Sequence, residues 1–128
     1  MGRDTQRRIA TEEAFAIPEQ MAALRELIAS SRDYDPDTFL AGMQTEGGRL
    51  TQRLVDLDDE RLRIMDDAGV SMHLLAMTST GVQQFSADKG AALAQIGNDR
   101  LAQAIKDHPG RYAGLATVTP QDPARAVK

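Results

Sequence analysis

The sequence contains no cysteine among its 128 residues, which excludes both a disulfide framework and a thiolate metal site. It also lacks any run approaching the roughly 18 apolar residues that a membrane span requires, and its N-terminus has no apolar segment of the signal-peptide kind. Internal repeats and low-complexity stretches are missing as well. We therefore expect a soluble protein with no membrane partner, and the absence of cysteine is compatible with a cytoplasmic location.

An excess of basic residues is also missing. The 15 lysines and arginines are outnumbered by 19 aspartates and glutamates, which gives a formal net charge of -4 and argues against a nucleic-acid partner. The composition is otherwise ordinary, because 41% of the residues are hydrophobic and 27% are charged. Nothing in it indicates disorder, and a chain of this length predicts one domain.

What the sequence does contain is an alternation of strand and helix patterns. Short apolar runs predict strands, and apolar residues at helical spacing predict helices. The predicted strands lie around 9–14, 70–78 and 112–119, and the predicted helices at 18–30, 50–68 and 87–107. This order implies βαβ units and a parallel sheet, so the predicted fold class is α/β.

Capping residues mark the boundaries of these helices. Pro18 suits the first turn of the first helix, and Gly69 suits the left-handed position that ends the second. Ser86 is a good N-cap for the third helix. Asp122 and Pro123 then predict the opening turn of a further helix. Because a domain rarely ends inside a starting helix, we expect the fold to continue beyond this sequence.

Two of the helices have a recognisable inner stripe of residues that should face a core. In the 50–68 helix the stripe is Leu54, Leu57, Arg61, Met65 and Ala68, and the acidic residues Asp56, Asp58, Asp59 and Glu60 lie mainly on the solvated side. In the 87–107 helix the stripe is Leu93, Ile96, Leu101 and Ile105. Both patterns predict amphipathic helices.

The first strand carries a carboxylate among small residues. Strand residues alternate between faces, so Ala10, Glu12 and Ala14 share one side and the odd-numbered residues share the other. The Glu12 side has almost no bulk for a core, which favours a polar pocket or a metal there. A solvated edge strand that leaves Glu12 in water is the alternative. Glu13, on the opposite face, is expected to make a supporting hydrogen bond or salt bridge.

Two segments resemble a known family. Residues 8–19, Arg-Ile-Ala-Thr-Glu-Glu-Ala-Phe-Ala-Ile-Pro-Glu, resemble the first barrel strand of the aromatic-acid decarboxylase branch of the amidohydrolase superfamily, and most closely that of 5-carboxyvanillate decarboxylases. Residues 77–83, Met-Thr-Ser-Thr-Gly-Val-Gln, are similar to the family's Leu-Thr-Ser-Pro-Gly-Val-Gln, with Thr80 in place of the proline. Many relatives have Glu-x-His in strand one. Here Glu12 matches the glutamate and Ala14 occupies the histidine position, as in the carboxyvanillate branch.

The resemblance implies a (β/α)8 TIM barrel that binds one divalent metal, Mn²⁺ or Zn²⁺, at the C-terminal ends of its strands. Because such a barrel needs about 250 residues, residues 1–128 are expected to form the N-terminal portion of a single metal-dependent domain, with about three βα units. Residues 31–49 are interpreted as a helical insertion after strand one that lies over the active-site face. The full-length enzyme is expected to be a homo-oligomer.

The resemblance also supplies candidate site residues. Glu12 is the candidate metal ligand. Thr78, Phe15 and Arg49 are candidates for binding an aromatic carboxylate substrate, as a hydroxyl donor, an aromatic wall and a carboxylate partner, respectively. Local backbone bonding, core packing and solvation are the simpler interpretations of these three. Two further candidates for lining the pocket come from the end of the third predicted strand: Thr117 and Thr119.

Other polar residues have structural interpretations. Gly81 lets the backbone turn tightly after the second strand, and Asn98 and Asp99 are expected to fix the long helix to a loop. His73 is expected to face the helix layer at the far end of the barrel from the active site. His108 is expected at a helix C-terminus, where its charge favours the helix dipole. Neither histidine is expected to bind metal.

The activity that the resemblance implies is non-oxidative decarboxylation of a hydroxylated aromatic carboxylate. In that reaction the metal binds the substrate carboxylate and the adjacent phenolate oxygen, and a buried aspartate protonates the ring before CO₂ leaves. This aspartate has no counterpart in residues 1–128 and is expected beyond Lys128. We therefore expect no catalytic residue in this chain, and we expect the chain to be inactive alone.

Two alternatives to the decarboxylase remain. The first is a metal-dependent hydrolase of a lactone or amide, against which Ala14 counts because hydrolytic relatives usually have a histidine there. The second is a non-catalytic fragment or split subunit that needs a complementary chain, since three parallel strands alone would leave open sheet edges.

Overall fold

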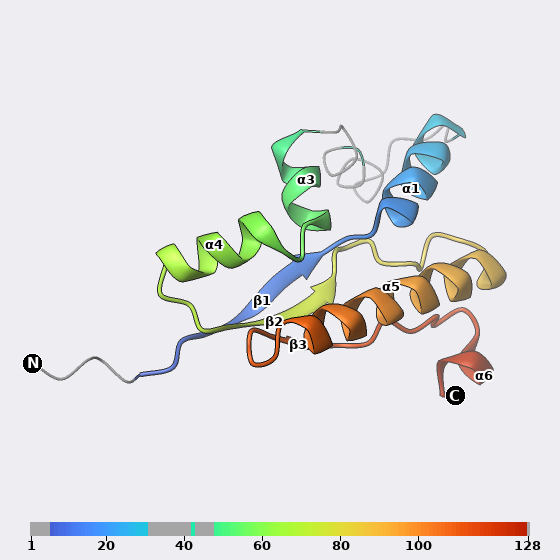
Figure 1. The fold of residues 1–128 in the computed structure, drawn as a ribbon. Coiled ribbons are helices and arrows are strands. Elements are labelled where there is room, and N and C mark those ends of the chain that lie inside the picture. Colours follow the sequence, from blue (N-terminus) through green and yellow to red (C-terminus); the bar gives the residue numbers. More distant parts are fainter. Residues whose placement is uncertain (1–5, 31–41, 43–47, 128) are drawn as a thin grey trace, which may run out of the picture.

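The computed structural model describes residues 6–30, 42 and 48–127. A three-stranded sheet lies at its centre, formed by β1 (Ile9–Phe15), β2 (Met72–Met77) and β3 (Tyr112–Gly114). The strands lie in the order β1-β2-β3, and both pairings are parallel, as Figure 1 allows the reader to follow. The predicted α/β class and parallel sheet are therefore confirmed.

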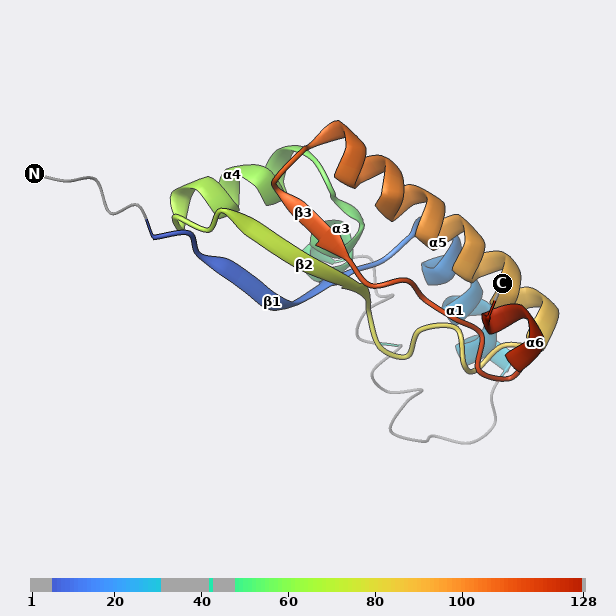
Figure 2. The same cartoon turned by 90° about the horizontal axis from the view of Figure 1, so that it is seen from below.

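Helices connect the strands in the order that the sequence predicts. The helices are α1 (Pro18–Ser30), α3 (Arg49–Val55), α4 (Asp59–Asp67), α5 (Ala87–Asp107) and α6 (Pro123–Ala126). Figure 2 shows the three strands side by side, with α5 extending alongside them from the end where the loops after the strands gather back to the start of β3.

Two predictions fall on residues that the structure does not describe. The interpreted insertion at 31–49 lies outside the described residues except at positions 42, 48 and 49. Lys128 lies outside them as well. The aspartate that is expected to protonate the substrate ring would follow it. The location of that aspartate therefore stays a prediction.

Most of the predicted helix boundaries are confirmed. Pro18 is the first residue of α1, and Gly69 follows α4 with a φ of 66°, the left-handed conformation that glycine adopts without strain. The Ser86 hydroxyl accepts a hydrogen bond from the backbone N–H of Lys89, at 3.3 Å, and so caps α5. The Asp122 side chain caps α6 in the same way.

The single helix predicted over 50–68 is wrong, because the chain forms two helices with a break between them. The Asp56 carboxylate accepts the backbone N–H groups of Asp58 and Arg61, at 3.0 and 2.8 Å. A short acidic side chain competes with the backbone in this way, which favours helix ends over helix interiors. Asp56, expected on the solvated side, is instead the residue that interrupts the helix.

The inner face of α5 differs from its predicted stripe at one position. Leu93 and Leu101 are buried as predicted, whereas Ile96 is exposed. The face turned toward the sheet is built from smaller residues, namely Gly90, Leu93, Ala94, Gly97, Leu101 and Ala104. A side chain at Gly97 would meet the Met77 side chain of β2, so the glycine lets helix and sheet approach closely.

The third strand is shorter than predicted, since β3 ends at Gly114 instead of position 119. Leu115 still donates a hydrogen bond to the Leu75 carbonyl of β2, at 2.9 Å. The chain then turns to α5, where the Asn98 side chain donates to the Thr117 carbonyl at 2.9 Å and accepts from its N–H at 2.8 Å. The backbone of Thr117 thus forms hydrogen bonds with the Asn98 side chain and not with a neighbouring strand.

None of the helices in the described part of the chain is both long enough and apolar enough to cross a lipid bilayer.

Candidate functional site

A β-bulge in β1 determines where the candidate metal ligand lies. Ala10 stands opposite His73 of β2, and Glu13 stands opposite Leu75. Two residues of β1, Thr11 and Glu12, therefore occupy the space opposite the single residue between His73 and Leu75. Bulges of this kind are common beside active sites, where they change the direction of a side chain.

The bulge corrects the predicted alternation of β1. Because partners in a ladder share a face, Ala10 and Glu13 lie on the same face as His73 and Leu75, not on opposite faces as expected. We call this the covered face, because Leu75 is fully buried there. Thr11 and Glu12 lie on the other side, which we call the open face and which they share with Leu74 and Ala76 of β2.

Glu12 itself is exposed on the open face. Among the described residues there is no group of three or more histidines, cysteines, aspartates or glutamates that could hold a metal ion. The described part of the chain does not supply a complete set of metal ligands, so the role of Glu12 as one oxygen ligand to a divalent ion stays a prediction.

Glu13 and His73 form a pair on the covered face. The Nδ1 atom of His73 lies 3.8 Å from Oε2 of Glu13 and, among the described residues, is buried without a hydrogen-bond partner. Burial lowers the pKa of His73, and the Glu13 carboxylate opposes that shift. A hollow of about 290 Å³ adjoins the pair, between β1 and helices α3 and α4. The prediction that His73 faces the helix layer is confirmed. The expected hydrogen bond or salt bridge of Glu13 stays a prediction, because 3.8 Å is too long for a hydrogen bond and the lowered pKa of His73 favours the neutral ring.

The loop after β2 carries Thr78 at the C-terminal end of the sheet. Thr78 is buried, its N–H donates to the Phe15 carbonyl at 2.7 Å, and its carbonyl accepts from the N–H of Gly81 at 2.8 Å. Gly81 has a φ of 62°, which confirms the predicted tight turn. The peptide bond between Ser79 and Thr80 is cis.

Two glutamine side chains hold this loop from opposite ends. The Gln20 amide of α1 donates to the carbonyls of Thr78 and Gly81, at 3.5 and 3.2 Å. The Gln121 amide donates to the carbonyls of Val82 and Phe85, at 2.9 and 3.0 Å. Loop carbonyls that would otherwise point at water are thus satisfied by side chains, which fixes the loop's shape.

A larger hollow opens beside this loop, at the C-terminal ends of β2 and β3. Its volume is about 750 Å³. It is lined by Ala76 and Met77 of β2, by loop residues 79–84 and by residues 115–118 after β3. In parallel α/β folds ligands bind at this end of the strands, so the hollow is the site that the topology favours.

Comparison with solved structures identifies the fold. The 5-carboxyvanillate decarboxylase of Sphingomonas paucimobilis superposes with a TM-score of 0.85 and 42% identity, over 94% of this chain and 37% of that one. The chain is similar to aromatic-acid decarboxylases over about a third of their length. The predicted partial (β/α)8 barrel is thereby confirmed.

Two further relatives of this decarboxylase family agree. The 5-carboxyvanillate decarboxylase of Novosphingobium aromaticivorans, solved with manganese and 4-hydroxy-3-methoxy-5-nitrobenzoic acid, is 38% identical, with a TM-score of 0.84 over 96% of this chain and 37% of that one. The gamma-resorcylate decarboxylase of Rhodococcus jostii is 31% identical over 124 residues, which are 96% of this chain and 33% of the relative. The chain thus spans about a third of these decarboxylases. No family model matches it.

The three candidate substrate residues, Thr78, Phe15 and Arg49, are not among the residues that line the larger hollow, and Thr78 is buried. Phe15 is fully buried in the core opposite Met77, as the core-packing interpretation expects. Arg49 is the first residue of α3, and its guanidinium lies 3.4 Å from the Glu60 carboxylate with 73% of the side chain exposed. Their roles in binding substrate stay predictions.

The residues after β3 meet the expectation only in part. Thr117 lines the larger hollow, whereas Thr119 is buried and its carbonyl accepts from the N–H of Asp122 at 3.0 Å. Asn98 joins α5 to this segment, as predicted, but Asp99 instead accepts from Gln95 on the same helix, at 2.8 Å.

Sequence reasoning missed three residues that shape the site. Gln20 lies four residues before Leu24, so an amide within the apolar stripe of the first helix was a usable signal. Gln121 has no such signal, because it follows a proline in a loop. The spacing of apolar residues over 50–68 predicts that Arg61 lies on the inner face of a helix, but it does not predict that the guanidinium binds backbone carbonyls.

Proposed function

We propose that this chain provides the first strands of a metal-dependent decarboxylase that removes the carboxylate group from a hydroxylated aromatic acid. The chain's share of the site would be the carboxylate of Glu12, as one ligand to a divalent ion, and the loop that carries Thr78. Manganese, which a structure of a relative contains, is the preferred ion. The acid that protonates the ring would come from a part of the enzyme beyond Lys128.

One arrangement supports this proposal: an exposed carboxylate, Glu12, lies at a bulge on the open face of a parallel sheet, and β2 and β3 of the same sheet end at a hollow of about 750 Å³. A divalent ion held there would neutralise the substrate carboxylate and so favour the charge that develops on the ring. Glu12 would hold that ion and take no proton. The Thr78 hydroxyl would donate to a substrate oxygen, and Arg49 would pair with a carboxylate if α3 stays close to β1.

The test is a chimeric enzyme in which this chain replaces the aligned third of the Sphingomonas paucimobilis enzyme. We expect it to release CO₂ from 5-carboxyvanillate in the presence of Mn²⁺. Glu12→Gln should lower that activity at least about 100-fold, because a neutral amide is a poor ligand for a hard cation. Glu13→Gln is the matched control, since the neighbouring carboxylate lies on the covered face. Equal activity of the two variants would remove the basis of the proposal.

Hydrolysis of a lactone or amide by the same chimera would favour the alternative reaction. Ala14 counts against it, because hydrolytic relatives usually have a histidine at this position. The assay should therefore follow both CO₂ release and lactone hydrolysis in the same preparation.

A second candidate function is that the chain works as one part of a split enzyme. Leu115 and Val118 expose 56% and 51% of their surface beside the hollow, and large apolar residues in such positions favour association with a partner. Light scattering of the isolated chain tests this candidate. A monodisperse monomer that gains no mass when the complementary two thirds of a relative is added would contradict it.

A further inference from the structure

Arg61 makes an unusual set of contacts for an arginine on a surface helix. From α4, its Nε donates to the Asp56 carbonyl at 2.7 Å, and its Nη2 donates to the Arg53 carbonyl at 2.8 Å and to the Ala14 carbonyl at 3.0 Å. These carbonyls belong to the break before α4, to the last turn of α3 and to β1, respectively. One side chain therefore joins three separate elements.

The geometry of these bonds suits a guanidinium and no other side chain. A planar fork of donors can reach carbonyls that lie in different directions, whereas the ammonium group of lysine is a single point on a flexible stem. The carbonyls at the end of α3 also carry the negative end of the helix dipole, which attracts a cation. The guanidinium of Arg61 thus donates its hydrogen bonds to backbone carbonyls.

Two other sets of contacts hold α3, one to the residue directly after β1 and one to α4. The N–H of Ala16, directly after β1, donates to the Leu54 carbonyl at 2.8 Å, and Leu54 is buried in the core. Glu60 of α4 accepts from Arg53 at 3.2 Å and from Arg49 at 3.4 Å. Exposed ion pairs such as these are individually weak, so the bonds of Arg61 and Ala16 carry most of the attachment.

We propose that Arg61 is a positioning residue that fixes α3, the helix that begins with Arg49, against the C-terminal end of the strand that carries Glu12. The inference deepens the proposed function, because Glu12 and Arg49 are the two charged groups assigned to metal and substrate. Ala14, whose carbonyl Arg61 binds, lies only two residues beyond Glu12. Without this side chain, α3 would keep the Ala16 bond and lose its link to β1 on the other side.

The absence of cysteine makes a direct test possible, because two introduced cysteines can be spin-labelled without background. Labels at Thr11→Cys in β1 and Gln52→Cys in α3 report the distance between the two elements. Both positions are exposed, so the labels need not disturb the core. We expect a narrow distance distribution by double electron–electron resonance in the chain with Arg61.

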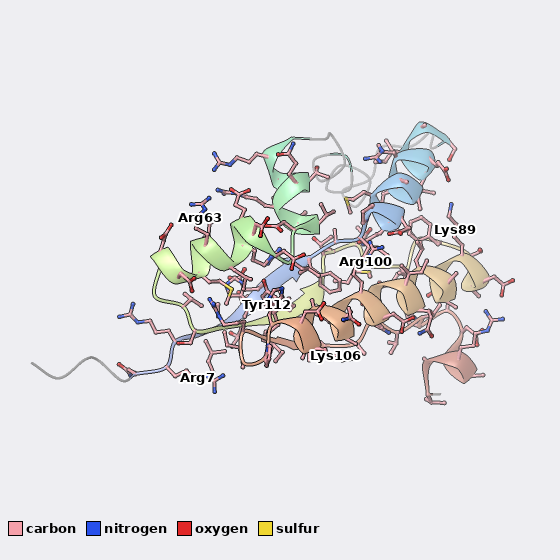
Figure 3. All side chains as sticks on the ribbon, in the orientation of Figure 1. Arg7, Arg63, Lys89, Arg100, Lys106 and Tyr112 are labelled. Carbon is pink, nitrogen blue, oxygen red and sulfur yellow. The ribbon has the colours of Figure 1, made fainter. Side chains whose placement is uncertain are left out.

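Arg61→Lys and Arg61→Gln are expected to broaden this distribution at least twofold while circular dichroism shows a folded chain. Arg63→Lys is the matched control on the same helix. Arg63 points away from the body of the molecule in Figure 3 and pairs only weakly, 3.5 Å from Asp67, so its replacement should leave the distribution narrow. A second label pair, Thr11→Cys with Gln103→Cys in α5, should stay narrow in every variant.

The outcomes separate this inference from the proposed function. A distribution that stays narrow in both Arg61 variants overturns the positioning role, and so does unfolding of both, because Arg61 would then stabilise the whole fold without a specific effect on α3. In the chimeric enzyme, Arg61→Lys should raise KM for 5-carboxyvanillate about tenfold and change kcat less than threefold. If the chimera with Arg61 is inactive, the proposed function fails while the spin-label result still decides the role of Arg61.

Discussion

The two faces of the sheet are built on different principles. On the covered face, Leu75 is fully buried, and the Leu101 side chain of α5 lies against the bare backbone of Gly114. On the open face, Glu12 is exposed and Leu74 and Ala76 are only partly buried. The covered face is therefore explained by residues of this chain alone. The open face is left largely uncovered by the described part of the chain.

The largest expected effect contrasts two consecutive leucines of β2. Leu75→Ala should lower the free energy of unfolding by about 2–5 kcal/mol, because it removes buried methyl groups and leaves a cavity. Leu74→Ala, on the open face, should cost less than about 1 kcal/mol. Urea denaturation followed by circular dichroism measures both values.

Equal losses for the two leucines would break the comparison, since they would show that both faces are packed in the isolated chain. The same two substitutions in the chimeric enzyme give a second test of the difference between the faces. If the remaining strands close a barrel over the open face, Leu74→Ala should become more costly there than in the isolated chain, while the cost of Leu75→Ala should change little.

A smaller effect is expected from adding one methyl group to β3. At Gly114 a Cβ atom would lie 2.8 Å from Cγ of Leu101, so Gly114→Ala should cost about 1–3 kcal/mol through overpacking. Ala113→Ser, one residue earlier and on the open face, should change stability by less than about 0.5 kcal/mol. Thermal unfolding of both variants provides the measurement. Recovery of stability in a Gly114→Ala and Leu101→Val double variant would identify Leu101 as the cause.

The smallest effect concerns pH and the covered face. Burial lowers the pKa of His73, so the folded chain binds a proton less readily than the unfolded chain does. The stabilisation is complete above the unfolded pKa of about 6.5 and is lost as the pH falls below it. The free energy of unfolding should therefore decrease from pH 7 to pH 5.5, by at most about 1.4 kcal/mol per pH unit.

His73→Gln should flatten this dependence, whereas Ala113→Ser, which changes no titratable group, should preserve it. Chemical denaturation at a series of pH values measures the slopes. A full slope in the His73 variant would show that another group causes it.

Elements whose signals are local could be predicted from the sequence. Pro18, Ser86 and Asp122 begin helices through bonds within one turn, so the residues that decide them lie next to one another in the chain. The helix break at Asp56 has a local cause as well, namely the hydrogen bonds that its carboxylate accepts. The sequence predicts one continuous helix there because the apolar spacing continues across the break. The early end of β3 depends on Asn98, which lies 19 residues from its partner Thr117.

Candidate site residues could be named from the sequence, but their geometry could not be predicted from it. Glu12 stands out because the strand around it lacks bulk, and the structure places it on the open face. The bulge that places it there is a relation between two strands, since its register is set by His73 and Leu75, about 60 residues away along the chain. The bonds of Gln20, Gln121 and Arg61 go to backbone carbonyls, and carbonyls carry no sequence signal.

The buried hydroxyl of Tyr112 connects two parts of the chain that are far apart in the sequence. It lies in the body of the molecule in Figure 3, where its hydroxyl donates to the Leu57 carbonyl at 2.9 Å and burial raises the pKa of its phenol to about 12. The bond joins the last strand to the gap between α3 and α4, 55 positions earlier in the chain. The position of the segment between α3 and α4 is therefore coupled, through a single hydrogen bond, to the presence of β3 in the sheet.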